Sequence, residues 1–158
     1  MKRLLFSYLF ILISLFILLY MDTSSISIML NEQQRQLILF LLDLGLKSNQ
    51  LQGDEIVMSA NYRLVITKAC NGIIPIILYI SMVWAYPYRK IIDRALWSLL
   101  GYVVLTIVDV ARILLVVSIV SDKKGRFPLT HDIGGNFIFM VSILSLLALY
   151  IRFTKRGV

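Results

Sequence analysis

The chain has 158 residues, of which 59% are hydrophobic, and a formal net charge of +7. A soluble domain of this length has too little interior to bury that much apolar surface, so the composition excludes an ordinary water-soluble protein and favours an integral membrane protein. The basic residues lie beside the apolar runs, so we interpret them as signals of membrane orientation and predict no nucleic-acid partner.

Four apolar segments are candidates for crossing a bilayer. The first, residues 4–21, resembles a signal peptide but lacks a small-residue cleavage site, so we expect a retained anchor. The other spans cover about residues 72–87, 91–110 and 133–151, and the third continues past Asp109 and Arg112 as a protruding or interfacial helix. We predict a single membrane domain, residues 1–158, built as an all-α bundle of about four transmembrane helices.

Between the first two spans, residues 22–70 are expected to form an outer-face segment. The run QLILFLLDLGL at 36–46 is short and contains Asp43, so we interpret it as an interfacial helix packed on the bundle. Two short runs rich in β-branched residues follow, EIVMS at 55–59 and YRLVIT at 62–67, with a turn signal between them. They predict a small β-hairpin that leads into Cys70.

The positions of the basic residues orient this arrangement. With four spans, both termini lie on one side of the membrane, and the short pieces on that side are rich in Lys and Arg. The positive-inside rule therefore places the termini inside and segment 22–70 outside. The inner basic residues are Lys2, Arg3, Arg89, Lys90, Arg94, Arg152, Lys155 and Arg156.

This topology brings three chemically distinctive residues to one side of the membrane at one depth. Cys70, the only cysteine, lies at the outer mouth of the second span. Arg112 lies at the outer end of the third span, and His131, the only histidine, lies just before the fourth. Three separate segments thus carry a thiol, a guanidinium and an imidazole toward one region.

Cys70 has two interpretations. A free cysteine is commonly a small buried hydrophobic residue. Alternatively, Cys70 is a nucleophile, since a thiol before a helix N-terminus and near a cation is favoured as thiolate. Asn71 and Gly72 allow the sharp turn and close backbone approach that such a site needs.

Arg112 stands within an apolar helix, where ionisable groups are costly and often functional. Asp109 lies three residues earlier on the same helix face and can pair with it. Either the two residues form a structural ion pair, or Arg112 is functional and stabilises an oxyanion or the thiolate.

His131 precedes the last span, where Thr130 or Asp132 can cap the helix. The histidine is either an interfacial residue beside this cap or a general acid and base. Cysteine, histidine and a cation form a recurring set for acyl transfer. One cysteine and one histidine supply too few soft ligands for zinc, so we predict no metal and no cofactor.

Three short motifs, ACNGI at 69–73, DVARI at 109–113 and HDIGG at 131–135, occur in this order at the outer edges of the spans. Over roughly residues 37–150 the chain resembles the exosortase/archaeosortase family, although Asn71 stands where Ser is commoner and Asp109 where Asn is usual. The resemblance implies a cysteine transpeptidase or protease of a prokaryotic inner membrane, with its active site on the outer face.

The same resemblance implies the roles of the residues and the partners. Cys70 would form a thioester, Arg112 would stabilise the oxyanion and His131 would carry the proton, with Asn71, Gly72, Asp109 and Asp132 in support. The substrate would be the C-terminal sorting signal of exported proteins: a short motif, a transmembrane helix and a basic tail. The cleaved protein would pass to an acceptor, such as a lipid or glycan, or to water.

A different class of function stays open at this point. The chain could be a non-catalytic assembly factor or transporter subunit, in which Asp109 and Arg112 hold helices together and Cys70 is dispensable. A plain intramembrane protease, which hydrolyses without transfer, is a further alternative.

Overall fold

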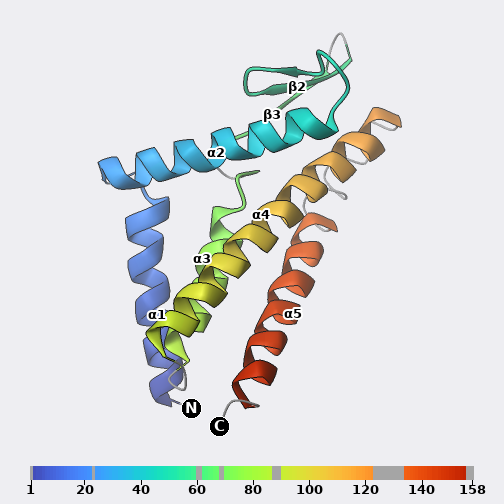
Figure 1. The fold of residues 1–158 in the computed structure, drawn as a ribbon. Helices are drawn as coiled ribbons and strands as arrows, with labels where there is room; N and C mark the ends of the chain where they lie inside the picture. Colours follow the sequence, from blue (N-terminus) through green and yellow to red (C-terminus); the bar gives the residue numbers. More distant parts are fainter. Residues whose placement is uncertain are drawn as a thin grey trace.

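The computed structural model of the chain describes residues 2–22, 24–59, 62–67, 70–86, 90–122 and 134–155. It is a helical bundle with a small sheet at one end (Figure 1). Its elements, in chain order, are α1 (Lys2–Leu15), the π-helical turn η1 (Phe16–Tyr20), α2 (Ser25–Gly45), β1 (Leu51–Gln52), β2 (Glu55–Ser59), β3 (Tyr62–Val65), α3 (Ile73–Ala85), α4 (Ile91–Asp122) and α5 (Gly135–Lys155).

Three helical stretches within these ranges are long and apolar enough to cross a membrane. They are Lys2–Tyr20, which joins α1 to η1, Ile91–Ile119 of α4 and Gly135–Phe153 of α5. The fourth apolar helix, α3, has 13 residues, so it extends only about 20 Å. It packs against α1, α4 and α5. The predicted all-α membrane bundle is confirmed, with α3 shorter than the segment expected to span.

Helix α2 lies across one end of the bundle, transverse to α1 (Figure 1). It begins where Ser24 accepts a hydrogen bond from the Ser27 backbone N–H (3.1 Å), a side-chain N-cap. It is therefore longer than the 36–46 helix expected from the sequence. One of its faces is buried against the bundle, and a second carries the exposed apolar residues Ile26, Met29, Leu37, Phe40 and Leu44. This amphipathic pattern is typical of a helix that lies in a membrane interface.

The three strands form an antiparallel sheet in the order β1-β2-β3. The predicted hairpin is confirmed in β2 and β3, where Ile56 pairs with Leu64, while the two-residue β1 was not predicted. Arg35 of α2 forms ion pairs with Asp54, which lies between β1 and β2, and with Glu32 of its own helix. The pair with Asp54 attaches the sheet to α2. The hydrogen bonds from Arg35, and then that from Gln36, hold the pKa of Glu32 below its usual value.

Two apolar clusters form the interior of the part of the chain that the structure describes. The outer cluster joins α2, the sheet and the protruding end of α4 through Ile38, Leu42, Ile56, Ile66, Val110, Ile113 and Val117. The inner cluster joins α3, α4 and α5 through Ile76, Tyr79, Val83, Leu105, Phe139, Leu146 and Tyr150. Cys70 packs against the outer cluster, close to the level where the two clusters meet along α4.

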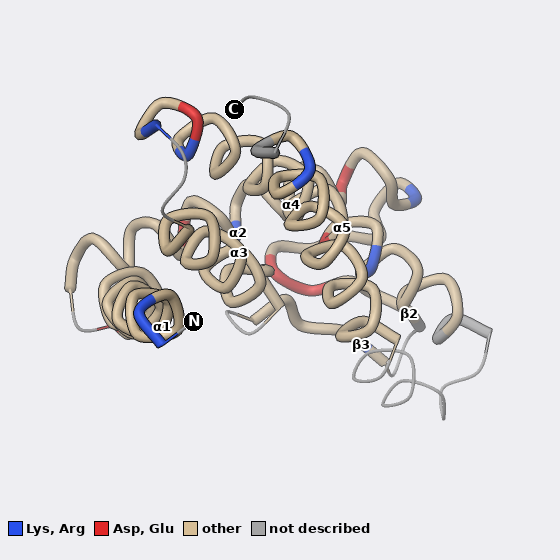
Figure 2. Tube along the Cα trace, turned by 90° about the horizontal axis from the view of Figure 1, so that it is seen from below, with Lys and Arg blue, Asp and Glu red and all other residues tan. Residues whose placement is uncertain are grey.

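The start of α1 and the end of α5 lie at the end of the bundle opposite α2 and the sheet (Figure 1). Seen from that end, Lys and Arg stand at the start of α1, beside the N-terminus (Figure 2). The predicted topology likewise has both ends of the chain on one side of the membrane. That this side faces the cytoplasm stays a prediction.

Gly101 sets how closely α3 and α4 approach. A Cβ at this position would lie 1.9 Å from Cε1 of Tyr79, which is fully buried and donates its hydroxyl to the Trp97 carbonyl (3.1 Å). We therefore expect Gly101→Ala to lower the free energy of unfolding by about 1–3 kcal/mol through overpacking. Thermal unfolding of the detergent-solubilised protein measures this, with Val103→Ala on the exposed face of α4 as the control. Equal effects of the two substitutions would contradict the packing described.

Candidate active site

The centre of the candidate site is a buried ion pair on α4. Nη2 of Arg112 lies 2.8 Å from Oδ1 of Asp109, and the two side chains are only 6% and 0% exposed. The pair is formed one helical turn apart, as the spacing of three residues predicts. Phe139 of α5 covers the guanidinium, with 5.0 Å between Cζ and the ring centroid.

The turn before α3 fits directly against this pair. Gly72 has φ of +65° and precedes the first residue of α3, so the turn uses a left-handed conformation that suits glycine. A Cβ on Gly72 would lie 2.9 Å from Oδ2 of Asp109. Glycine is therefore required both by the backbone angle and by the contact with the Asp109 carboxylate.

Cys70 begins this turn. Its backbone N–H donates to the Thr67 carbonyl (2.9 Å), and the Thr67 hydroxyl donates to its sulfur (3.7 Å). The thiol is half-buried and lines a small apolar pocket of about 40 Å³, which it shares with Arg112 and with residues of β3 and α4. The structure thus brings Cys70 and Arg112 to one pocket, as the sequence predicted.

The start of α5 closes the other side of Arg112. A Cβ on Gly135 would lie 2.9 Å from Cδ of Arg112, so the helix packs against the arginine side chain itself. The three sequence motifs therefore meet here: the second supplies the Asp109–Arg112 pair, and the first and third supply Gly72 and Gly135, which pack against it. His131 and Asp132 lie outside the described residues.

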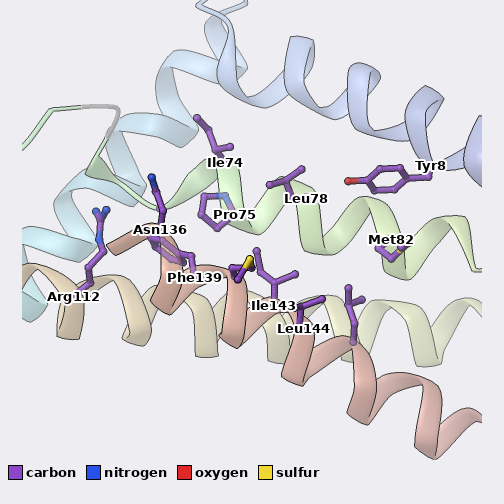
Figure 3. Close-up of a pocket in the computed structure, with 13 residues that line it drawn as sticks. Tyr8, Ile74, Pro75, Leu78, Met82, Arg112, Asn136, Phe139, Ile143 and Leu144 are labelled. Carbon is purple, nitrogen blue, oxygen red and sulfur yellow. The ribbon is translucent and has the colours of Figure 1, made fainter. Parts of the chain in front are cut away.

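A groove runs from this site along the bundle between α1, α3 and α5 (Figure 3). Its volume is about 430 Å³. Arg112 and Asn136 lie at one end, and Tyr8 and Met82 lie toward the other (Figure 3). Apolar side chains line most of its length: Ile74, Pro75, Leu78, Phe139, Met140, Ile143, Leu144 and Leu147. Arg112 lines both this groove and the Cys70 pocket, so it stands where the two meet.

Sequence reasoning missed two buried amides on α2 that contact the turn. Asn31 accepts a hydrogen bond from Nδ2 of Asn71 (3.2 Å), and Gln34 donates to the Asn71 carbonyl (3.4 Å). In the sequence, the spacing of three residues indicates that the two amides share one helix face, opposite an apolar face. Only the fold shows that this face contacts the turn before α3.

The arrangement can stabilise negative charge. A guanidinium in a site shielded from water interacts more strongly with a developing oxyanion than one in water does. Nε of Arg112 is buried and has no hydrogen-bond partner among the described residues. A thiol that shares a pocket with such a donor fits nucleophilic attack on a carbonyl group.

Comparison with known protein families identifies the family of the chain. The family model described as transmembrane exosortase (EpsH) matches residues 1–148. Searches of curated proteins and of solved structures found no match. Because the family model covers nearly the whole chain, including the segments that carry Cys70, Asp109 and Arg112, the protein belongs to the transmembrane exosortase family.

Proposed function

We propose that this chain is a membrane-embedded cysteine transpeptidase that cleaves C-terminal sorting signals of exported proteins on the outer face of a prokaryotic inner membrane. One observation carries the proposal most directly: Cys70 and the buried Arg112 line the same pocket, and Arg112 also lines the groove within the membrane bundle. Membership of the exosortase family supports the same chemistry.

In the proposed reaction, His131 takes the proton of the Cys70 thiol, and the resulting thiolate attacks the carbonyl carbon of the scissile peptide bond. A carbon–sulfur bond forms, and the carbonyl oxygen becomes an oxyanion that accepts a hydrogen bond from Arg112. The carbon–nitrogen bond then breaks as His131 gives its proton to the leaving amine. An acceptor nucleophile next attacks the thioester and gives its proton to His131, and the carbon–sulfur bond breaks to release the Cys70 thiolate, which regains the proton from His131.

Arg112 suits the oxyanion role because its charge is held in place before the reaction. Asp109 binds Nη2, Phe139 covers the guanidinium plane and Gly135 packs against the Cδ atom. The N–H on Nε of Arg112 has no hydrogen-bond partner among the described residues, and leaving a buried donor unpaired costs about 1–3 kcal/mol, or more when the group is charged. A substrate oxyanion would supply the missing acceptor.

His131 enters the proposal through chain connectivity and through the family resemblance. It precedes Gly135 by four residues in the sequence. Gly135 packs against Arg112. We therefore assign the role of general acid and base at this pocket to the His131 imidazole.

The groove offers a place for the transmembrane helix of the sorting signal. It is apolar along its length and ends at Arg112 and Gly72, beside the proposed nucleophile. A helix lying there would place its outer end beside Cys70. The depth at which the substrate helix sits in the bilayer would then determine which peptide bond is cleaved.

Removing the nucleophile tests the proposed function. We expect Cys70→Ala to reduce processing by roughly 10³-fold or more, because the covalent route is lost. In the source organism, intact mass measurement of exported proteins that end in a helix and a basic tail would show the uncleaved form accumulating. Ser118→Ala, an exposed small side chain on α4, is the matched control and leaves processing unchanged. Normal processing with Cys70→Ala would instead support a non-catalytic assembly role.

Filling the groove tests where the substrate helix binds. Leu144 lines the groove and is 58% exposed, whereas Leu149 on the same helix is also exposed but does not line it. We expect Leu144→Trp to raise KM about fivefold or more, equivalent to about 1 kcal/mol of binding, with little change in kcat. Leu149→Trp should leave both unchanged. An unaltered KM in Leu144→Trp would show that the substrate helix binds elsewhere.

A further inference from the structure

We propose that Gln34 of α2 is a positioning residue that sets the distance between the Cys70 sulfur and the Arg112 guanidinium. This inference rests on the proposed function, since it assigns a role to a residue that touches neither the substrate nor the reacting atoms. It is carried by the hydrogen bonds that connect α2, the Cys70–Gly72 turn and α4.

The turn is held from α2 through Asn71, which is 1% exposed. Nε2 of Gln34 donates to the backbone carbonyl of Asn71 (3.4 Å), and Nδ2 of Asn71 donates to Oδ1 of Asn31 (3.2 Å). The Asn71 side chain also accepts from the Ile73 backbone N–H (3.2 Å), which joins the turn to the start of α3. Both the main chain and the side chain of the residue after Cys70 are therefore held.

Asn31 is itself fixed by the backbone around it. Its Nδ2 donates to the carbonyls of Leu19 (2.8 Å) and Ser27 (2.7 Å), which leaves Oδ1 as the acceptor for Asn71. Asn31 thus anchors the Asn71 side chain to η1 and α2. It does not contact α4 through a hydrogen bond among the described residues.

Gln34 alone of the two amides also bonds to α4. Its Oε1 accepts from the Tyr102 hydroxyl (2.6 Å), and its Nε2 donates to Oγ1 of Thr106 (3.3 Å). Tyr102, Thr106, Asp109 and Arg112 succeed one another at spacings of four, three and three residues, so they share one face of α4. Gln34 therefore connects the turn that carries the nucleophile to the helix face that carries the cation.

Attachment of α2 to the bundle does not require these amides. Ile38 and Leu42, one and two turns further along the buried face, already pack in the outer cluster. An apolar residue at position 34 could continue that packing, whereas a buried amide is costly unless its hydrogen bonds are made. Unlike apolar packing, the hydrogen bonds of Gln34 hold the turn in one orientation relative to α4. This directional role explains why an amide stands at position 34.

The first test separates positioning from binding and from folding. We expect Gln34→Ala to slow single-turnover acylation of Cys70 by about 10–100-fold, because misplacement by about 1 Å costs that much. KM should change little, whereas the thermal unfolding midpoint should fall because a buried side chain and its hydrogen bonds are removed, so the acylation rate is compared per folded molecule. Gln33→Ala, on the exposed face of α2, is the matched control and should behave as wild type.

A double-mutant cycle sharpens this test. Tyr102→Phe keeps Gln34 but removes the hydroxyl that orients it, so we expect a smaller loss in the same direction. The double variant Gln34→Ala/Tyr102→Phe should be no slower than Gln34→Ala alone, because both substitutions act through one connection. If Gln34→Ala does not fold, Tyr102→Phe still carries the test, with an acylation rate equal to wild type as the contradicting result.

A second readout does not depend on catalysis. Ile113 lines the same small pocket as Cys70, and Cys70 is the only cysteine, so Ile113→Cys creates a single defined pair. We expect oxidation to cross-link this pair, measured by mass spectrometry, and Gln34→Ala to reduce the yield at least threefold. If the cross-link is unaffected, or if acylation falls only as folded protein is lost, the positioning role is wrong. Processing that continues in Cys70→Ala would overturn the proposed function. The cross-linking yield would still show whether Gln34 positions Cys70, because that measurement does not depend on catalysis.

Discussion

The buried ion pair between Asp109 and Arg112 is the constraint on which the rest of the site depends. A charged side chain within an apolar bundle needs a partner, and breaking a buried pair costs about 3–5 kcal/mol because one charge is left uncompensated. Here each partner also contacts a glycine from another segment, Gly72 at Asp109 and Gly135 at Arg112. The pair therefore organises the beginnings of α3 and α5 as well as its own helix.

Around this pair, the fold separates two environments that the proposed reaction would need. The apolar groove between α1, α3 and α5 suits a helix within the bilayer, and the small pocket beside β3 holds the thiol. Arg112 borders both, so in the proposed function one cation would connect binding of the substrate helix with the reaction at Cys70. Helix α2 and the sheet cover the end of the bundle opposite the start of α1 (Figure 1), and the ion pair between Arg35 and Asp54 attaches the sheet to the helix.

Much of this arrangement could be predicted from the sequence. The lengths of the apolar runs indicated α1, α4 and α5, the turn signal between residues 59 and 62 indicated the hairpin, and the spacing of Asp109 and Arg112 indicated their pairing. The first half of α2 was not predicted, since its inward face carries Asn31 and Gln34 rather than apolar residues and so hides the helical pattern. The contacts of Gly72 and Gly135 depend on how separate segments pack, which local patterns do not encode. The roles of His131 and Asp132 stay predictions.

The most direct measurement is to isolate the covalent intermediate. The full-length protein in membranes is mixed with a sorting-signal substrate, quenched in acid during a single turnover and analysed by peptide mass spectrometry. A thioester between Cys70 and the substrate carbonyl, cleaved by hydroxylamine and formed much more slowly in Arg112→Ala, is the expected result. Substrate cleaved at the wild-type rate with no adduct on Cys70 would contradict nucleophilic catalysis by this residue.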